Sequence, residues 1–303
     1  MQVVSLAAFS CLLALALPAQ GTEWVTNGSF TGTLAPWVMG GGYSVNPGLE
    51  TGWDTTGMAV SDSFGVQAGG QVTPAPYPPN TIEQTITVIQ GLTYEIRADV
   101  SGNRTAAPTV NNADTGTIWA EVDNVEVARV ALGNYANNGL PGGSVKRTQL
   151  CGRFTPSTSG LVTLRISFQR AYLANTTTPR VNIDNVSVRD VYGPTYWISS
   201  NRKIGTTLVH EVRTEPNAFF GLFIAVAENP AGTPFAGVTT PWFLDLGTTT
   251  TLAFGTADTT GAGSANIAVP NDPAFLSTPL WYQPAALTTQ IEFGYQFGVV
   301  CTQ

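Results

Sequence analysis

The residue that most suggests chemistry in this sequence is Trp119, which stands beside Glu121 in a run of alternating apolar and polar residues. Alternation places both side chains on the polar face of a strand whose other face is apolar. An indole in that position exposes apolar surface to water unless something covers it. Two interpretations are open: the ring is buried beneath the loop of residues 101–115, or it is a platform that stacks on the C–H face of a sugar ring.

Planar hydrogen-bonding side chains occupy outward positions of neighbouring predicted strands. Glu95 and Arg97 lie on the polar face of residues 92–100, and Arg165 and Gln169 lie on that of the strand that begins at residue 160. Side chains of these types orient sugar hydroxyl groups. We therefore predict one wet sheet face that binds a glycan through Trp119, Glu121, Arg97, Arg165, Glu95 and Gln169.

Catalytic motifs are scarce. The single histidine, His210, lies in a predicted strand, where a structural role is the commoner one. The sequence has no Gly-x-Ser-x-Gly elbow, no phosphate loop and no zinc-ligand spacing. Glu95, Asp99 and Glu121 could still supply paired carboxylates on one sheet, so a divergent glycoside hydrolase remains a third hypothesis. The prediction is that the protein is not an enzyme.

The elements that must position these residues are short strands. Only 11% of the residues are charged, and 32 Gly and 20 Pro punctuate β-branched runs, which predicts an all-β protein. A boundary near Tyr192-Gly193-Pro194 divides it into an N-terminal antiparallel β-sandwich, residues 21–191, and a smaller β-sandwich, residues 192–303. The net charge of −7 makes nucleic acid an improbable partner.

The first 20 residues are predicted to be a signal peptide. An apolar run from Leu6 to Leu17 precedes Pro18-Ala19-Gln20-Gly21, and a run of that length is too short to span a bilayer. The expected product is secreted and not inserted in a membrane. Cys151 and Cys301 would then remain, and either a disulfide between them or two separately buried thiols is consistent with the sequence.

In the predicted strand around residues 181–188, the alternation of apolar and polar residues shifts by one position. Val181 and Ile183 have odd positions, whereas Val186 and Val188 have even ones, which predicts a β-bulge at Asp184-Asn185. A bulge can aim a carboxylate and carbonyl oxygens at one point, which suits calcium. A bulge that merely bends an edge strand is the alternative.

Three segments resemble jelly-roll carbohydrate-binding modules with a galactose-binding-like fold, over about residues 22–191. They are Asn27-Gly28-Ser29-Phe30 followed by Pro36-Trp37, Gly91-Leu92-Thr93-Tyr94 after the strand of residues 84–88, and Ile183-Asp184-Asn185-Val186. The C-terminal part resembles uncharacterised β-sandwich domains of secreted bacterial proteins, through Pro241-Trp242-Phe243 and Trp281-Tyr282-Gln283.

The first resemblance implies that the opening and closing segments lie side by side, often around a structural calcium. For this chain the implied ligands are Asp184, Asn185 and Asn27. The pattern departs from the family because Ser29 and Thr31 stand where it has acidic residues, and Asn185 replaces its second acid.

The leading hypothesis is a secreted, non-catalytic protein whose first domain binds a polysaccharide or glycoconjugate. The alternative is a structural or adhesive surface protein without a soluble ligand.

Overall fold

The computed structural model describes residues 22–41, 44–68, 78–103, 113–135, 145–170, 180–200, 202–276 and 278–301. The predicted signal peptide lies outside these residues. Strands dominate the described residues, with one short 3-10 helix at Pro273–Leu276. The prediction of an all-β protein is therefore confirmed. No helix of the described residues is long and apolar enough to cross a membrane.

Twelve strands precede the linker at residues 191–194. They are β1 (Val38–Gly41), β2 (Ser44–Trp53), β3 (Ser61–Ala68), β4 (Asn80–Val88), β5 (Tyr94–Asn103), β6 (Ala113–Asp114), β7 (Thr117–Val122), β8 (Val125–Ala131), β9 (Asn134–Tyr135), β10 (Val145–Phe154), β11 (Gly160–Gln169) and β12 (Arg180–Asp190). Ten of them form two five-stranded antiparallel sheets, which we call the β5 sheet, in the order β10-β5-β12-β3-β2, and the β11 sheet, in the order β1-β4-β11-β7-β8. β6 and β9 pair separately.

The two sheets pack face to face as the first sandwich. Alternate residues of each strand point inward, as the sequence pattern predicts, so Ile96 and Ile166 are completely buried. Aromatic rings fill the core near β3: the Phe64 ring centroid lies 5.6 Å from that of Phe168 and 6.4 Å from that of Phe30.

The opening segment packs directly on the closing strand. The Val186 amide donates to the Gly28 carbonyl at 2.9 Å, and a Cβ atom at Gly28 would lie only 1.8 Å from the Val186 carbonyl oxygen. The pairing of β12 with β5 shifts register between Asp184 and Ser187, and Asn185 has a φ of 51°. The predicted bulge is therefore confirmed, and only glycine fits where the opening segment crosses it.

The remaining strands form the second sandwich. They are β13 (Thr195–Ile198), β14 (Thr207–Arg213), β15 (Phe219–Ala225), β16 (Glu228–Thr233), β17 (Trp242–Leu244), β18 (Thr250–Thr256), β19 (Ala262–Ala268), β20 (Leu280–Leu287), β21 (Ile291–Phe293) and β22 (Phe297–Val299). The sheet β13-β14-β19 packs on a sheet of order β18-β15-β20-β21, in which β22 also pairs with β20. Tyr196, Phe220 and Tyr282 belong to the core between them.

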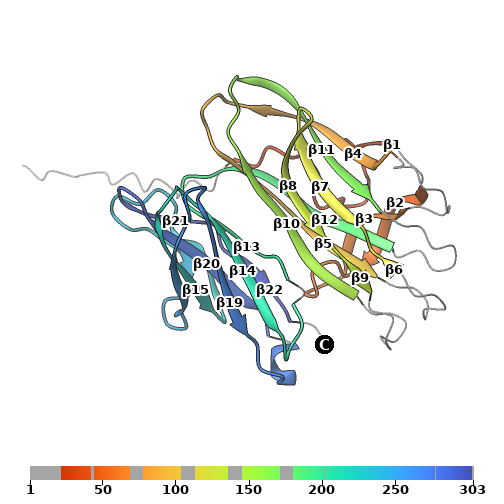
Figure 1. Cartoon of the computed structure of the whole chain (residues 1–303). Helices are drawn as coiled ribbons and strands as arrows, with labels where there is room; N and C mark the ends of the chain where they lie inside the picture. The colour runs from red at the N-terminus through yellow and green to blue at the C-terminus, as the bar shows by residue number, and fades with distance from the viewer. Residues whose placement is uncertain are drawn as a thin grey trace, which may run out of the picture.

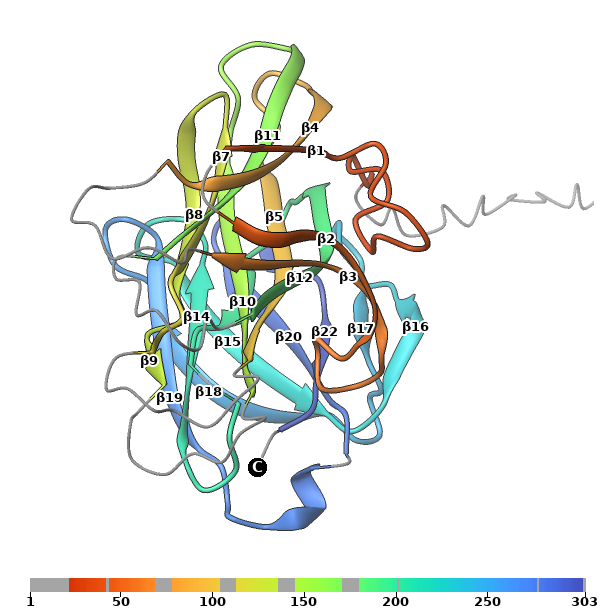
Figure 2. The same ribbon diagram turned by 90° about the vertical axis from the view of Figure 1, so that its right-hand side faces the viewer.

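The second sandwich docks against the outer side of β5 and β10 (Figure 1). In Figure 2, which views the molecule from the side of the first sandwich, the strands of the second lie behind it. The Arg97 guanidinium on β5 donates to the Tyr196 carbonyl at 2.7 Å and lies 4.8 Å from the Phe297 ring centroid. The linker is fixed as well, because a Cβ atom at Gly193 would lie 2.2 Å from the Phe293 carbonyl oxygen.

Replacing Gly28 by alanine tests the contact between the opening segment and β12. The added methyl group must displace backbone atoms of Val186, so we expect Gly28→Ala to lower the free energy of unfolding by more than about 2 kcal/mol. Gly48→Ala is the control, because a Cβ atom there meets nothing within 4 Å. Equal denaturation midpoints for the two variants would contradict the packing described.

Candidate functional site

The predicted wet face of the β11 sheet exists, but its tryptophan is covered. Trp119 and Glu121 point outward from β7 as predicted, and Ser167 is the residue opposite Trp119 on β11. Trp119 is only 9% exposed, and the Arg129 guanidinium of β8 lies 4.9 Å from its ring centroid. Residues 104–112 of the loop expected to cover it lie outside the described residues. The indole is therefore not an open platform for a sugar ring.

The charged residues of this face pair with one another. The Arg165 Nε donates to Glu83 Oε1 at 2.6 Å, and its Nη1 donates to Asn124 Oδ1 at 2.6 Å. Glu121 accepts a hydrogen bond from Ser167 Oγ at 3.2 Å and lies 3.8 Å from Arg165 Nη1. A ligand on this face would have to compete with these contacts. Gln169 lies at the end of the same row, opposite Thr117.

Glu95 and Arg97 are not on that face. Both project from β5, in the other sheet, and Arg97 Nε donates to Glu95 Oε1 at 2.9 Å beneath the second sandwich. The prediction that they join Trp119 in one site was wrong. Alternation fixes which side of a strand a residue occupies, but not which of two sheets the strand enters.

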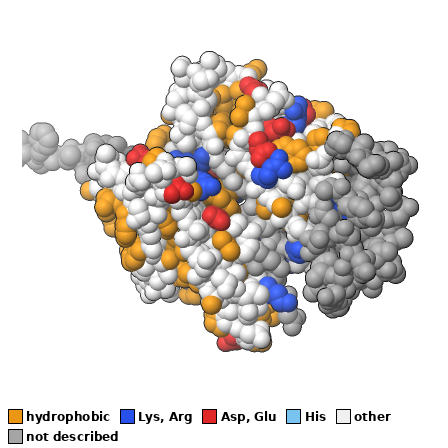
Figure 3. All heavy atoms as spheres, viewed as in Figure 1, with side chains coloured by type: hydrophobic (Ala, Val, Ile, Leu, Met, Phe, Trp, Pro, Cys, Tyr) orange, Lys and Arg blue, Asp and Glu red, His pale blue; other side chains and the backbone are white. Residues whose placement is uncertain are grey.

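A cleft of about 940 Å³ opens where the two sandwiches meet. Its wall on the first sandwich includes Glu126–Arg129 of β8 and Cys151–Phe154 of β10, which approach so closely that a Cβ atom at Gly152 would lie 2.0 Å from the Val127 carbonyl oxygen. The second sandwich contributes Trp197, Arg213, Glu215 and Thr260. Figure 3 shows charged side chains on both sides of this junction.

An aromatic ring and charged side chains converge in the cleft. Trp197 projects outward from β13, is partly exposed, and has the Arg213 guanidinium 5.6 Å from its ring centroid. Arg153 Nη1 donates to the Arg213 carbonyl at 3.1 Å, and burial lowers the pKa of Arg153. Among the described residues, neither Arg213 nor Glu215 takes part in an ion pair. The Glu215 carboxylate is thus available to a ligand, whereas the Arg213 guanidinium lies over the Trp197 ring, which is more exposed than that of Trp119.

Arg129 joins the predicted face to the cleft. It lines the cleft, covers Trp119, and donates through Nε to Glu126 Oε1 at 2.7 Å. The residues predicted on β7 and β11 therefore lie next to β8, the strand that borders the cleft. Trp197 was not predicted from the sequence as a site residue. Its outward position between the buried Tyr196 and Ile198 is the same signal that singled out Trp119.

The two cysteines are separate buried thiols, so the structure has no disulfide between Cys151 and Cys301. Cys151 lines the cleft beside Arg97 of β5, whereas Cys301 belongs to the core of the second sandwich. Burial raises the pKa of both thiols, which keeps them protonated and unreactive.

His210 is a core residue. Its Nδ1 forms a hydrogen bond with the Tyr196 hydroxyl group, and its ring lies 5.5 Å from that of Tyr282. Burial lowers the pKa of His210 to about 4, so the ring is neutral at physiological pH. This burial agrees with the structural role that the sequence predicts for His210.

The residues proposed as calcium ligands all make hydrogen bonds within the protein. The buried Asp184 carboxylate accepts hydrogen bonds from Ser61 Oγ and from the Asn185 amide. Asn185 Nδ2 donates to Asp99 Oδ2 at 3.0 Å, and Asn27 Nδ2 donates to two loop carbonyls. Within the described parts of the chain, no three His, Cys, Asp or Glu side chains gather to hold a metal. Both Asp184 oxygens and the amide nitrogens of Asn185 and Asn27 are therefore engaged, and a calcium ion at this bulge stays a prediction.

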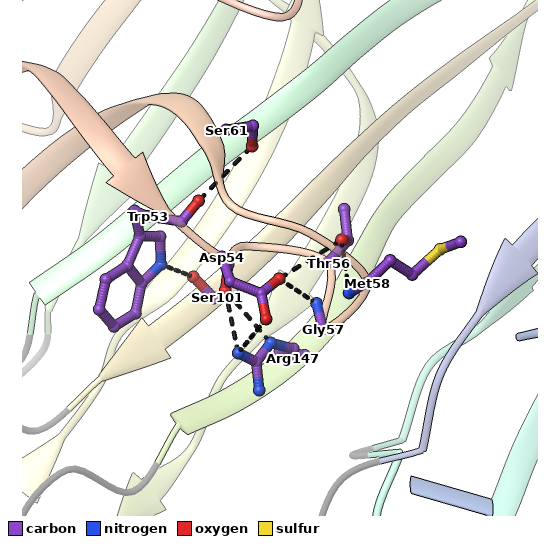
Figure 4. Close-up of polar contacts among 8 residues, drawn as sticks. All are labelled: Trp53, Asp54, Thr56, Gly57, Met58, Ser61, Ser101 and Arg147. Carbon is purple, nitrogen blue, oxygen red and sulfur yellow. Dashed lines mark hydrogen bonds and ion pairs between the residues drawn. The ribbon is translucent and has the colours of Figure 1, made fainter. Parts of the chain in front are cut away.

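A second polar cluster, at the end of β2, has a structural role (Figure 4). The Asp54 carboxylate accepts the Gly57 amide at 2.5 Å and Arg147 Nη2 at 3.1 Å, while Trp53 Nε1 donates to Ser101 Oγ at 2.9 Å. These bonds fasten the turn at residues 54–57 over the β5 sheet. Both Asp54 oxygens are used, so the cluster offers little to a ligand.

Comparison with known proteins gives distant matches only. No family model matches the chain, and no curated protein matches it. Among solved structures, Bacteroides uniformis beta-glucuronidase is 10% identical with a TM-score of 0.26, and the match covers 74% of this chain and 26% of that one. The adhesin domain of Epf from Streptococcus pyogenes is 10% identical with a TM-score of 0.26, over 80% of this chain and 78% of that one.

A third neighbour, GH2 beta-galacturonidase from Eisenbergiella tayi, is 9% identical with a TM-score of 0.29, over 88% of this chain and 43% of that one. The chain thus spans about a quarter of the length of the glucuronidase. Scores this low carry no argument about function.

The pKa of Asp184 gives a pH-dependent prediction. Burial, reinforced by the charges of Asp99 and Asp62, raises this pKa from 3.8 to about 6, against the opposing hydrogen bonds from Ser61 and Asn185. The folded protein therefore binds this proton more tightly than the unfolded chain does. The contribution of Asp184 to stability is greatest below pH 4 and is lost as the pH rises through 6.

We expect Asp184→Asn to be more stable than the wild type at pH 7.5, by about 1 to 3 kcal/mol, and equal to it near pH 4. The asparagine oxygen can still accept the Asn185 amide, and its nitrogen can donate to Ser61. Urea denaturation at both pH values, with and without calcium, measures this. A wild type that calcium stabilises, and a variant that it does not, would instead show an ion at Asp184.

Proposed function

We propose that this protein is a secreted, non-catalytic glycan-binding protein whose ligand lies in the cleft between the two sandwiches, with Trp197 stacking on a sugar ring. The observation that carries this proposal is the cleft itself, where a partly exposed indole lies among charged side chains from both sandwiches. A sugar presents apolar C–H faces and a rim of hydroxyl groups, and this combination of an aromatic surface with planar polar groups suits both.

The resemblance of residues 22–191 to jelly-roll carbohydrate-binding modules supports the same class of ligand. The proposed location differs from the one expected from sequence, because on the outer face of the β11 sheet Arg129 covers Trp119 and Arg165 pairs with Glu83. Arg129 also lines the cleft, so a longer glycan would extend from Trp197 toward this face. The structural or adhesive alternative predicts no binding of a soluble glycan.

Glycan-array binding followed by calorimetry with the best soluble oligosaccharide tests this proposal. Trp197→Ala should weaken the affinity at least about fivefold, since stacking on an aromatic ring is worth roughly 1 kcal/mol or more. Phe254→Ala is the matched control, because Phe254 is an exposed aromatic residue that does not line the cleft, and it should leave the Kd unchanged.

Equal affinities for Trp197→Ala and the wild type would show that Trp197 and its cleft do not bind the glycan. Absence of binding to any glycan would favour the adhesive alternative. Release of reducing sugar from a polysaccharide, abolished by Glu121→Gln, would favour the hydrolase hypothesis.

A further inference from the structure

An arginine of the cleft, Arg153, has no acidic partner among the described residues. It projects from β10, and its Nη1 donates to the Arg213 carbonyl at 3.1 Å. In the described part of the chain, its Nε and Nη2 donate to no other group, and no carboxylate lies within ion-pair distance. Neither nitrogen is sealed off from solvent, so the edge that they form stays accessible from the cleft.

The carboxylate best placed to pair with Arg153 is engaged by another arginine. Glu95 is the residue directly opposite Arg153 in the pairing of β10 with β5. Its Oε1 instead accepts Arg97 Nε at 2.9 Å and lies 2.8 Å from Arg97 Nη2. Opposite charges on facing strand positions normally pair with each other. The contact between Glu95 and Arg97 at the junction of the sandwiches is therefore what leaves Arg153 without an ion pair.

The two arginines differ in how their burial is offset. Burial opposes the charge of Arg97, but Glu95 more than compensates and raises the pKa of Arg97. Burial lowers the pKa of Arg153, and the charges of Glu95 and Glu215 only partly oppose this effect. Arg153 thus keeps a desolvation cost that the described chain does not remove. An anion that reaches its Nε–Nη2 edge would remove it, because opposite charges attract strongly where water is scarce.

The other charged residues of the cleft leave room for an anion. Glu126 pairs with Arg129, and Asp190 Oδ1 accepts the Thr22 amide at 2.7 Å. Glu215 is exposed, so water and salt screen its charge. The described lining of the cleft holds three arginines and three acidic residues, whereas the whole chain has a net charge of −7. The cleft therefore lacks the negative charge that would repel an anion from most of this protein.

We propose that the ligand of the cleft is an acidic glycan, whose carboxylate or sulfate group binds the Nε–Nη2 edge of Arg153. This edge presents two parallel N–H groups, which match two oxygens of either anion in a bidentate contact. Because the assignment names the class of glycan at the cleft, it rests on the proposed function.

The anion site lies next to the proposed stacking residue. Arg213 contacts both, since its carbonyl accepts Arg153 Nη1 and its guanidinium lies 5.6 Å from the Trp197 ring centroid. The acidic group therefore belongs to the sugar at Trp197 or to the sugar beside it. Glu215, which lines the same cleft, is left to accept hydrogen bonds from hydroxyl groups.

Titration calorimetry at low ionic strength with matched oligosaccharides tests this assignment. Tetragalacturonate and a hyaluronan tetrasaccharide supply carboxylates, and their carboxyl-reduced forms are the neutral counterparts. Carboxyl-reduced chondroitin sulfate supplies sulfate alone, and its desulfated form is its counterpart. The wild type should bind an acidic probe at least about tenfold more tightly than the neutral form of the same backbone, since a hydrogen bond to a charged group is worth that factor or more.

Arg153→Gln should abolish this preference and leave the affinity for the neutral form within about twofold of the wild type. Lys203→Gln is the matched control, because it removes the same charge from an exposed residue that does not line the cleft, and it should keep the preference. Arg153→Lys keeps the charge but lacks the two-nitrogen edge, so it should bind the acidic probe more weakly than the wild type does. Near-ultraviolet circular dichroism confirms that each variant is folded.

Equal affinities of the wild type for the acidic and neutral forms of a bound glycan would overturn the assignment and leave the glycan site standing. A preference that Arg153→Gln retains would overturn it as well. Tighter binding of the sulfated probe would identify the anion as a sulfate ester, and tighter binding of the carboxylate probes would identify it as a uronic acid. Absence of binding to any glycan, neutral or acidic, would instead contradict the proposed function itself.

Discussion

The arrangement of this protein depends on a desolvated charge at the junction of its two sandwiches. The Arg97 guanidinium pairs with Glu95 on its own strand, donates to the Tyr196 carbonyl of the second sandwich, and lies over the Phe297 ring. A buried charge is tolerated only when its partners are fixed, because an uncompensated one costs several kcal/mol. The contact therefore holds the second sandwich in one position, and that position creates the cleft.

The same contact explains the fate of the predicted site residues. Glu95 and Arg97 have the side-chain chemistry of a glycan site, but they use it to join the two sandwiches. Arg165 and Glu121 pair across adjacent strands of the β11 sheet, which stabilises that sheet more than it serves a ligand. Only 11% of the residues are charged, and Arg213 and Glu215 are among those that line the cleft without an ion pair in the described part of the chain. Of these two, the Glu215 carboxylate is the one available for recognition, because the Arg213 guanidinium lies over the Trp197 ring.

Side-chain alternation in the sequence predicted those features that depend on the geometry of a single strand. The inward rows of β5 and β11 and the bulge at Asp184 follow from side-chain alternation, which one strand shows by itself. The division of strands between two sheets depends on pairings between distant segments, so Arg97 and Trp119 could not be separated in advance. The Arg129 cover over Trp119 depends on such a pairing as well, since it comes from the neighbouring strand.

The cleft was harder to foresee, because it lies between the two sandwiches and depends on how they dock. Its walls combine residues near 127, 153, 197 and 214, and no spacing in the sequence relates them. Gly152 and Gly193 permit the backbone to approach Val127 and Phe293 closely behind those walls. In the sequence alone, each looks like an ordinary glycine of a strand or turn.

NMR of the indole N–H signals of Trp197 and Trp119, during titration with an oligosaccharide that the protein binds, shows whether the glycan occupies the cleft or the β11 sheet. A glycan in the cleft should cause a large, saturable shift of the Trp197 signal and a smaller one for Trp119, which lies beneath Arg129. A shift of Trp119 with Trp197 unchanged would contradict binding in the cleft.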